Sequence, residues 1–488
     1  MNAALIIIFA VMVLSIFLGI RARKGKDMDL EQWTVGGRGF GSVFVFLLMA
    51  GEIYTTFTFL GGSGWAYGKG GPTFYITAYG CLAYIMSYFL LPKIWRYGKK
   101  HRLVSQSDFF VSKYNSPYLG VLVSIVGVVA MVPYLVLQLK GLGLIVEEAS
   151  YGAISSTLAI WIGMIVVTIY VMTSGIHGSA WTAVAKDALI LIVVLFLGIY
   201  LPIHYYGGFQ PMFESIQSTK PGFLVLPDQG QSSYWFVTTI LLTALGFYMW
   251  PHSFGSIYSA QNEKVFRKNA IIMPLYQLIL VFVFFVGFAA ILQVPHLNDP
   301  DMALLALSGK TFSPWIVGVI GAAGVLTALV PGSMLLMTAA TLLSKNIYKV
   351  FNPKVTDTQV SRLAKYLVPV FALVSLYFTF QGGKTIVALL LMGYSLVTQL
   401  FPTMIFSLMK NNFVTKAGAF AGIIAGVVTV AYISLSGSTV GSLFPFLPQA
   451  IQDFNVGIIA MIVNVIVLVI VSLVTRPVAV TEKKIESA

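Results

Sequence analysis

Long, continuous runs of apolar residues dominate this chain, and short polar or turn-forming segments separate them. About 20 apolar residues are enough for a helix to cross a bilayer, so the runs predict thirteen membrane-spanning helices. We place them near residues 2–20, 42–67, 73–95, 117–146, 151–173, 180–205, 234–259, 270–294, 313–343, 363–381, 385–409, 416–435 and 455–475. Hydrophobicity is continuous rather than alternating within the runs, which excludes a β-barrel. The predicted fold class is an all-α integral membrane protein.

The composition agrees with a membrane protein and leaves little chain for a soluble domain. Of the 488 residues, 58% are hydrophobic and only 10% are charged, whereas soluble proteins carry about 25% charged residues. We find no Walker loop, zinc-ligand spacing, nucleophile elbow or dinucleotide fingerprint, and none of the five histidines pairs with another at ligand spacing. The lone Cys81 allows no intrachain disulfide. The sequence therefore predicts neither an enzyme nor a bound cofactor.

The basic residues predict the orientation of the chain rather than a nucleic-acid partner, although the formal net charge is +13. With the N-terminus outside, 25 of the 30 Lys and Arg residues fall on the inside, as the positive-inside rule requires. Lys186 is counted among these inner residues, whereas Lys140 lies within a span. We predict a multi-pass protein of the plasma (inner) membrane with a cytoplasmic C-terminus. The outer loops near 206–233 and 295–312 should hold short interfacial helices.

Two of the predicted spans are interrupted in mid-membrane by small or helix-breaking residues. Span 42–67 contains Gly61, Gly62 and Gly64, and span 234–259 contains Trp250-Pro251-His252. Counted from the second span, they are the first and the sixth, five apart. Broken helices at equivalent places in two five-helix halves indicate an inverted-repeat transporter with a central site. Two unrelated kinks are the alternative, because Gly and Pro are common in membrane helices.

The segments around these interruptions resemble the solute:sodium symporter family, which carries proline, sugars, sialic acid, pantothenate and monocarboxylates. WTVGGRGFG (33–41) and AGEIYTTFTFLGGSGWAYGKGG (50–71) are similar to the entry and first core helix of that family. WPHSFGSIYSA (250–260) resembles its Gln-Pro-His stretch in core helix six, and LLSKNIYKVF (342–351) the Asp-Leu-Tyr-Lys end of core helix eight. ALVPGSMLLMTAATLLSKN (328–346) is most similar to the monocarboxylate-transporter branch.

The resemblance implies a leucine-transporter-like fold with two inverted repeats of five helices. Residues 1–20 would form an extra first helix, 39–206 core helices one to five, 234–410 core helices six to ten, 415–475 two further helices and 476–488 a cytoplasmic tail. The chain would be a secondary active symporter that imports a small organic solute, most similar to a monocarboxylate carrier, coupled to an ion gradient. An uncoupled channel or a transporter-like sensor is the alternative from another class, although no ring-forming filter segment is visible.

Three charged positions within or beside the spans are candidates for chemistry. Glu52 is the only acidic residue deep in a predicted span, where an unpaired carboxylate is costly; its alternative role is a hydrogen-bonded structural carboxyl. Lys140 lies roughly 10 Å inside the outer end of its span, so it is either a counter-ion for an anionic substrate or a lysine that snorkels to the interface. Lys186 and Asp187 begin core helix five, either as a functional group or as a solvated ion pair.

The other candidate substrate-binding residues lie at the two interruptions or on helices expected to face them. Trp250 and His252 flank Pro251, where side chains can face a cavity instead of lipid. Ordinary packing is the alternative for each candidate. With Lys140, the predicted substrate-binding set comprises Thr55, Thr56, Phe57, Tyr75, Tyr79, Gln138, Trp250, His252, Tyr394 and Gln399.

The coupling ion is predicted from a departure from the family pattern. In the family, sodium is held by main-chain carbonyls that match Gly51 and Tyr54, and by one carbonyl and two hydroxyls of core helix eight. Here the carbonyl position matches Thr327, and the hydroxyl positions fall on Val330 and Pro331, which carry no side-chain oxygen. A hard cation that wants about five or six oxygen ligands would lose two of them.

A family acidic residue on the sodium path also aligns with Ala183, close to Lys186. A lysine near an abandoned cation site supplies the missing positive charge, and a buried carboxyl or ammonium can load and release a proton. We therefore favour H+ over Na+ as the coupling ion, with Glu52 or Lys186 as its carrier. The alternative is a slipped alignment in which sodium is served by Thr327, Ser333 or Thr338.

Overall fold

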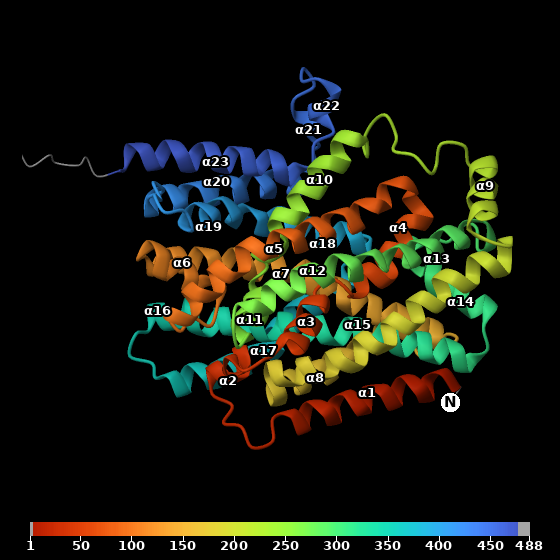
Figure 1. Cartoon of the computed structure of the whole chain (residues 1–488), viewed down its shortest axis with the longest axis horizontal. Helices are drawn as coiled ribbons and strands as arrows, with labels where there is room; N and C mark the ends of the chain where they lie inside the picture. Colours follow the sequence, from red (N-terminus) through yellow and green to blue (C-terminus); the bar gives the residue numbers. More distant parts are fainter. Residues whose placement is uncertain (1–2, 477–488) are drawn as a thin grey trace, which may run out of the picture.

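The computed structural model describes residues 3–476, which form a bundle of helices that run mostly along one common axis (Figure 1). Within this part of the chain, ten helices are long and apolar enough to cross a membrane, or eleven if the bent pair Ser233–Met249 and Pro251–Ser259 is one span. Length and composition alone therefore do not confirm the predicted number of thirteen membrane spans. That number depends on how two interrupted segments, 42–69 and 156–206, are counted.

The longest helix, α8 (Ser156–Tyr206), spans 51 residues and contains a kink at Gly175. The chain folds back on itself at this residue, because the hydroxyls of Tyr170 and Thr182, which lie on either side of Gly175, are only 2.7 Å apart. Each half is about as long as a bilayer-crossing helix or longer, so α8 accounts for two spans. The sequence predicts separate spans on either side of 173–180, and the structure has the turn between two helices at Gly175. Gly175 has a φ of +53°, and a Cβ there would lie 2.5 Å from the carbonyl oxygen of Trp33, so only glycine fits.

The segment predicted as span 42–67 is a broken helix. It consists of α3 (Ser42–Ala50), an irregular stretch, the π-helical turn η2 (Phe57–Gly61) and α4 (Gly62–Lys69). The break lies at 51–55 and not at Gly61, Gly62 and Gly64, which are helical. Those glycines allow close packing instead, because a Cβ on Gly64 would lie 2.8 Å from the carbonyl oxygen of Pro300.

The remaining helices complete the bundle. The helices that belong to the remaining candidate spans are α1 (Ala3–Ala22), α5 (Tyr75–Lys100), α7 (Pro117–Ala149), α10 (Ser233–Gly246), α11 (Pro251–Ser259), α12 (Lys264–Leu278), α13 (Leu280–Gln293), α15 (Pro314–Thr341), α16 (Lys349–Phe351), α17 (Asp357–Phe380), α18 (Ile386–Val397), α19 (Phe401–Ser407), α20 (Lys416–Leu435) and α23 (Val456–Val474). The helices between the spans are α2 (Leu30–Val35), α6 (Gln106–Tyr114), α9 (Phe209–Thr219), α14 (Ala303–Thr311), α21 (Val440–Leu443) and α22 (Gln449–Gln452). The two long loops contain the short helices α9 and α14, and the location of these helices at the outer membrane interface stays a prediction.

Helix α15 forms the centre of the bundle, because all of its residues from Ile320 to Thr341 are buried, whereas most residues of α1 are not. Figure 1 shows α1 along one edge and the packed pair α20 and α23 along the opposite edge. Helices α9 and α14 lie at one end of the bundle, and α6 and α16 at the other (Figure 1). We name these the outer and the inner end, after the predicted orientation.

Candidate functional site

Side chains bind the backbone carbonyls that are freed where α3 ends, two of them from other helices and one from the broken helix itself. Tyr134 donates to the Glu52 carbonyl (3.1 Å), and the Lys186 ammonium donates to the Tyr54 carbonyl (3.2 Å). The Thr58 hydroxyl donates to the carbonyl of Ile53 (2.7 Å). A buried carbonyl without a partner is costly, so this break is held open by specific contacts.

A second break separates α10 from α11, and the two helices meet at 56°. A 3-10 turn, η4 (Phe247–Met249), leads into Trp250, which is extended with φ −65° and ψ 128°. Pro251 explains this geometry, because the residue before a proline is driven out of the helical region and proline itself starts a helix well. The carbonyl of Met249, which loses its helical partner, accepts a bond from the Gln106 amide (2.7 Å).

The Glu52 carboxylate joins the two breaks. Its oxygens accept hydrogen bonds from the hydroxyls of Ser253 (2.6 Å) and Ser256 (2.9 Å), both in α11. Because residues 51–55 are irregular, Thr55 and Thr56 do not share a helical face with Glu52, as a continuous helix would have required. The hydroxyls of the two α11 serines, and not those of the neighbouring threonines, therefore bind the Glu52 carboxylate.

Lys186 is fully buried, and this excludes the alternative of a solvated ion pair at the inner surface. Its ammonium lies 2.9 Å from the Asp187 carboxylate, and the two side chains are 0% and 5% exposed. A Cβ on Gly51 would lie 3.3 Å from the same ammonium. Lys186 thus lies directly against the broken segment, between Gly51 and Tyr54. An unpaired ammonium at this depth would be costly, and the Tyr54 carbonyl and the Asp187 carboxylate compensate the Lys186 charge.

The second half of α8 runs antiparallel to α15, and this register relates Lys186 to the predicted cation ligands. Ser179 and Ser333 share a hydrogen bond of 2.7 Å, and Thr182 and Val330 line one small cavity. One further turn of each helix brings Lys186 to the level of Thr327. The Thr327 hydroxyl donates to the carbonyl of Gly324 (2.6 Å) in its own helix. Val330 and Pro331 are buried without side-chain oxygens.

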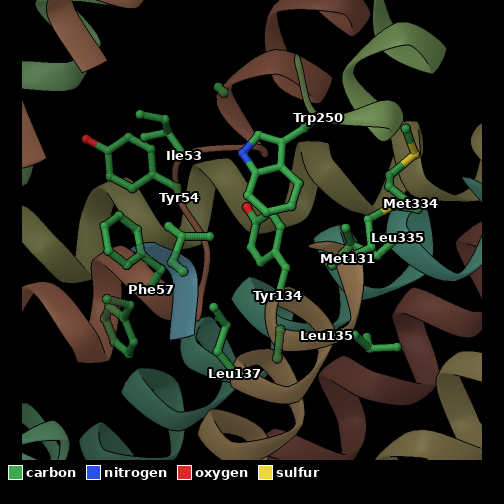
Figure 2. Packing of buried hydrophobic residues seen from close by; sticks show 14 of the residues in the cluster. Ile53, Tyr54, Phe57, Met131, Tyr134, Leu135, Leu137, Trp250, Met334 and Leu335 are labelled. Atoms are coloured by element: carbon green, nitrogen blue, oxygen red, sulfur yellow. The ribbon is translucent and has the colours of Figure 1, made fainter. Parts of the chain in front are cut away.

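An aromatic cluster surrounds the second break. Figure 2 shows the Trp250 indole beside the Tyr134 ring, with its nitrogen turned toward the side on which Ile53 and Tyr54 lie. The centroids of the Trp250 and Tyr134 rings are 4.8 Å apart, and Trp250 is 5.3 Å from Tyr394. The cluster also includes His252, Tyr79 and Tyr75. Five predicted residues are therefore brought together, and Tyr134 joins them.

Several buried polar atoms beside this cluster have no hydrogen-bond partner in the part of the chain that the structure describes. They include Thr56 Oγ1, Gln138 Nε2 and Trp250 Nε1, and also the Tyr75 hydroxyl and His252 Nδ1. Gln138 and Thr56 are neighbours, because the Gln138 side-chain oxygen accepts a bond from the Thr56 amide (3.4 Å). Thr56 Oγ1, Gln138 Nε2 and Trp250 Nε1 can all donate hydrogen bonds, so together they suit a ligand with several acceptor atoms. Phe57, 2% exposed, follows Thr56 in the chain.

Two predicted site residues make their contacts elsewhere. Gln399 donates to the carbonyls of Ser395 (3.0 Å) and Gly457 (3.1 Å) and so ties α18 to α23. Lys140 forms ion pairs with Asp301 (2.8 Å) and Asp299 (3.0 Å) of the outer loop. Thr55 remains at the first break, where its hydroxyl accepts the amide of Phe57 (3.1 Å).

Three residues of this site are not indicated by the sequence pattern, namely Tyr134, Ser253 and Ser256. Tyr134 lies one turn before Gln138, so helical spacing alone could have placed it on the same face of α7. The serines offered no such signal, because their partner Glu52 lies about 200 residues away in the chain. Asp301 was missed for the same reason, since its partner Lys140 is 161 residues distant.

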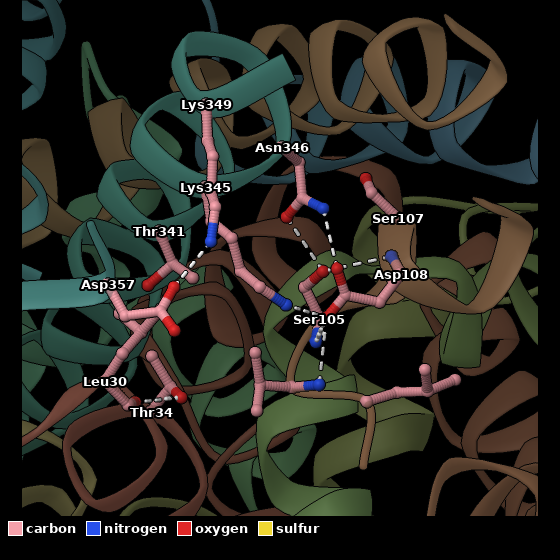
Figure 3. Close-up of polar contacts among 12 residues, drawn as sticks. Leu30, Thr34, Ser105, Ser107, Asp108, Thr341, Lys345, Asn346, Lys349 and Asp357 are labelled. Atoms are coloured by element: carbon pink, nitrogen blue, oxygen red, sulfur yellow. Dashed lines mark hydrogen bonds and ion pairs between the residues drawn. The ribbon is translucent and has the colours of Figure 1, made fainter. Parts of the chain in front are cut away.

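A separate polar cluster lies at the inner end, where α6 meets the π-helical turn η6 (Leu342–Tyr348). Figure 3 shows Asp108 in contact with Lys345 and Asn346, and Ser105 bonded to Asn346. Burial raises the pKa of Asp108, but the Lys345 ammonium and the hydrogen bonds from Val104 and Asn346 outweigh burial, so the pKa lies below its ordinary value. The cluster anchors α6 to the end of the central helix.

Comparison with known proteins places the chain among transporters. The profile of the sodium:solute symporter family matches residues 33–426. The chain is 72% identical to the Bacillus subtilis (strain 168) protein named uncharacterized symporter YhjB, over 98% of both chains. It is 29% identical to the monocarboxylate transport permease protein of Rhizobium johnstonii, over 88% of both. The structure of a Na+-coupled sialic acid symporter in a substrate-bound outward-open state superimposes with a TM-score of 0.81 at 15% identity, over 97% of this chain and 98% of that one.

Proposed function

Because the chain belongs to the sodium:solute symporter family, we propose that it is a proton-coupled symporter that imports a small monocarboxylate. Symport of a solute and the leucine-transporter-like fold follow from the family and from the structural likeness. The coupling ion, the solute and the orientation in the plasma membrane are the steps that we add. The observation that carries the proposal is the contact between the Lys186 ammonium and the Tyr54 carbonyl.

Proton coupling is supported by what surrounds that ammonium. Tyr54 is one of the two positions at which the family resemblance puts a sodium-binding carbonyl, and Lys186 already binds it. A second cation at the same carbonyl would meet the repulsion of a fixed positive charge about 3 Å away. Val330 and Pro331 offer no replacement oxygens. A proton needs no such ligand set, and the buried Glu52 carboxylate, bonded to α11, is our preferred carrier.

A carboxylate substrate is supported by the orphaned donors of the central cluster. Thr56 Oγ1, Gln138 Nε2 and Trp250 Nε1 can each donate one hydrogen bond, and a carboxylate has two oxygens that accept several. Tyr75, Tyr79, His252, Tyr394 and Phe57 would enclose the remainder of a small solute. The name of the Rhizobium relative, a monocarboxylate transport permease, points to the same class.

The proposal is tested by uptake into proteoliposomes with pH and sodium gradients imposed separately. We expect labelled short-chain monocarboxylates to accumulate under an inward proton gradient in sodium-free buffer. Glu52→Gln should abolish this accumulation but retain counterflow exchange between equal pools, because exchange needs no net proton movement. Exposed Lys310→Gln is the matched control and should behave like the wild type. Strict dependence on sodium without any response to pH would overturn proton coupling.

Sodium-coupled symport is the second candidate, and the hydroxyl pair Ser179 and Ser333 favours it. These two oxygens lie 2.7 Å apart between α8 and α15 and would supply ligands if the true sodium position were displaced toward the inner end. The structural relative is itself described as Na+-coupled. In the same assay this candidate requires accumulation in a sodium gradient at constant pH, and its loss in Ser333→Ala.

A further inference from the structure

The buried carboxylate of Asp301 is the centre of a polar junction at the outer end. Asp301 is 0% exposed, and its Oδ2 accepts both the Lys140 ammonium (2.8 Å) and the backbone amide of Ile386 (3.0 Å). Lys140 also lies 3.0 Å from Asp299 and donates to the Lys384 carbonyl (3.4 Å). The ammonium is therefore shared between two carboxylates and a carbonyl, and the carboxylate between a side chain and a helix N-terminus.

These contacts connect four separate elements. Lys140 lies in α7, Asp301 in the 3-10 turn η5 (Pro300–Met302), and Ile386 is the first residue of α18. The fourth element is α4, the outer half of the broken helix. A Cβ on its Gly64 would lie 2.9 Å from the Asp301 Cα, so the backbones touch. Moving α4 away from α7 and α18 must disturb this junction.

Aromatic rings close the route from the outer end to the central cluster. Trp65 of α4 stacks on Trp235 of α10 at 5.7 Å, and Trp235 meets Tyr75 edge-on at 5.5 Å. Tyr75 stacks on Tyr79 at 5.9 Å, and Tyr79 contacts Tyr394 of the central cluster. Tyr75 and Tyr79 are 0% and 1% exposed. The outer side of the central site is thus closed while the junction is made.

We propose that Lys140 and Asp301 form a latch that holds the outer end closed, and that the pair separates whenever the central site opens to the outside. An ion pair with a fully buried member suits this role, because separating the two groups while the junction stays dry leaves a buried carboxylate unpaired, which is costly. The pair therefore favours two discrete states of the outer end. In the closed state Lys140 and Asp301 are in contact, and in the open state both side chains are hydrated. The latch goes beyond the proposed substrate and coupling ion and rests only on alternating access.

The latch also gives Lys140 a role different from that of substrate counter-ion. Its charge is already met by Asp299 and Asp301, whereas the orphaned donors lie at the central cluster. The two roles predict different results. A counter-ion variant loses substrate affinity and keeps its closed outer end, and a latch variant opens without any substrate present.

The test measures access to the central site from outside, in substrate-free proteoliposomes. In a Cys81→Ala background, Phe57→Cys places a reporter thiol at the first break, where the native side chain is 2% exposed. We expect Asp301→Asn and Lys140→Gln each to raise the rate of labelling by an impermeant thiol reagent about tenfold, equivalent to about 1.4 kcal/mol in the equilibrium between closed and open states. Lys140→Arg keeps the charge and should stay near the parent rate.

The matched control is Asp228→Asn, which neutralises an exposed acid of the other outer loop and should leave labelling unchanged. Amide hydrogen exchange over residues 384–392 provides a second readout without the reporter, and should rise in Asp301→Asn and Lys140→Gln alone. If either variant labels and exchanges like Asp228→Asn, the latch is wrong. Loss of carboxylate binding in Lys140→Gln with unchanged labelling likewise overturns it and assigns Lys140 to the substrate. Because neither readout needs transport, failure of the proposed function leaves this result interpretable.

Discussion

The side-chain nitrogen of Lys186 lies 3.2 Å from the carbonyl oxygen of Tyr54, across 132 positions of sequence, at the point where a membrane helix is broken. The nitrogen binds a carbonyl that helix geometry has released, and Asp187 balances its charge. Without the lysine, the buried Asp187 carboxylate would lose its counter-ion and the buried Tyr54 carbonyl its hydrogen-bond donor.

Replacing Lys186 separates its effect on stability from its effect on coupling. We expect Lys186→Met to lower the free energy of unfolding by roughly 3–5 kcal/mol, because Asp187 is left charged and unpaired in the interior. Lys186→Met with Asp187→Asn should recover most of that loss, since the unpaired charge is gone, yet should not recover proton-driven uptake. Thermal unfolding in detergent and gradient-driven uptake report the two quantities. Normal pH-driven uptake by the double variant would exclude a role for Lys186 in coupling.

Trp250→Phe tests the proposed carboxylate site. The substitution keeps an aromatic ring against Tyr134 and Tyr394 and removes only the orphaned Nε1 donor, so folding should be preserved. Loss of one charge-assisted hydrogen bond, worth about 1.5–3 kcal/mol, should raise the KM for monocarboxylates by roughly ten- to a hundredfold. Inhibition by the corresponding neutral amides serves as the comparison, and it should weaken less. Equal weakening for both ligands would mean that Nε1 does not face the carboxylate.

The inner cluster predicts a defined pH dependence. Asp108 has a lowered pKa, although burial opposes ionisation, because Lys345, Val104 and Asn346 favour the charged form. Its stabilisation is therefore fully present above the pKa of an ordinary aspartate, about 3.9, and is lost as the pH falls through the lowered value. Asp108→Asn should cost about 1.5–3 kcal/mol of stability between pH 5 and 8. Melting curves should show this gap narrow only below about pH 4, and a gap that closes already near pH 6 would contradict the assignment.

The orientation is tested by two single cysteines in a Cys81→Ala background. Lys100 ends α5 at the predicted inner end, and Asp228 lies in the long outer loop; both are exposed. Asp228→Cys should react with an impermeant thiol reagent added to whole cells, whereas Lys100→Cys should react only after the membrane is opened. Reaction of both from the same side would invalidate the predicted topology.

The sequence predicts the helical class well because hydrophobic runs respond to one dominant force, the transfer of apolar side chains out of water. It misplaces the first break for an equally physical reason. The glycine-rich segment 61–64 has the composition expected of a helix break. The actual break, at 51–55, is stabilised by hydrogen bonds from Tyr134 and Lys186, which lie 82 and 132 positions from their partners in the chain. Likewise, the charge of Lys186 was visible, whereas its burial depends on the packing of α8 against α15 and the broken helix.

A lysine bound at the broken helix also has an electrical consequence. A free cation bound there would cross the membrane with its solute and feel the membrane potential, at about 2.3 kcal/mol per elementary charge for each 100 mV. The Lys186 ammonium is tethered to α8, so this charge never leaves the protein. If one proton accompanies one carboxylate, the loaded carrier and the empty carrier hold the same net charge. The cycle is then electroneutral, and accumulation is limited by the pH difference alone, however strongly the membrane is polarised.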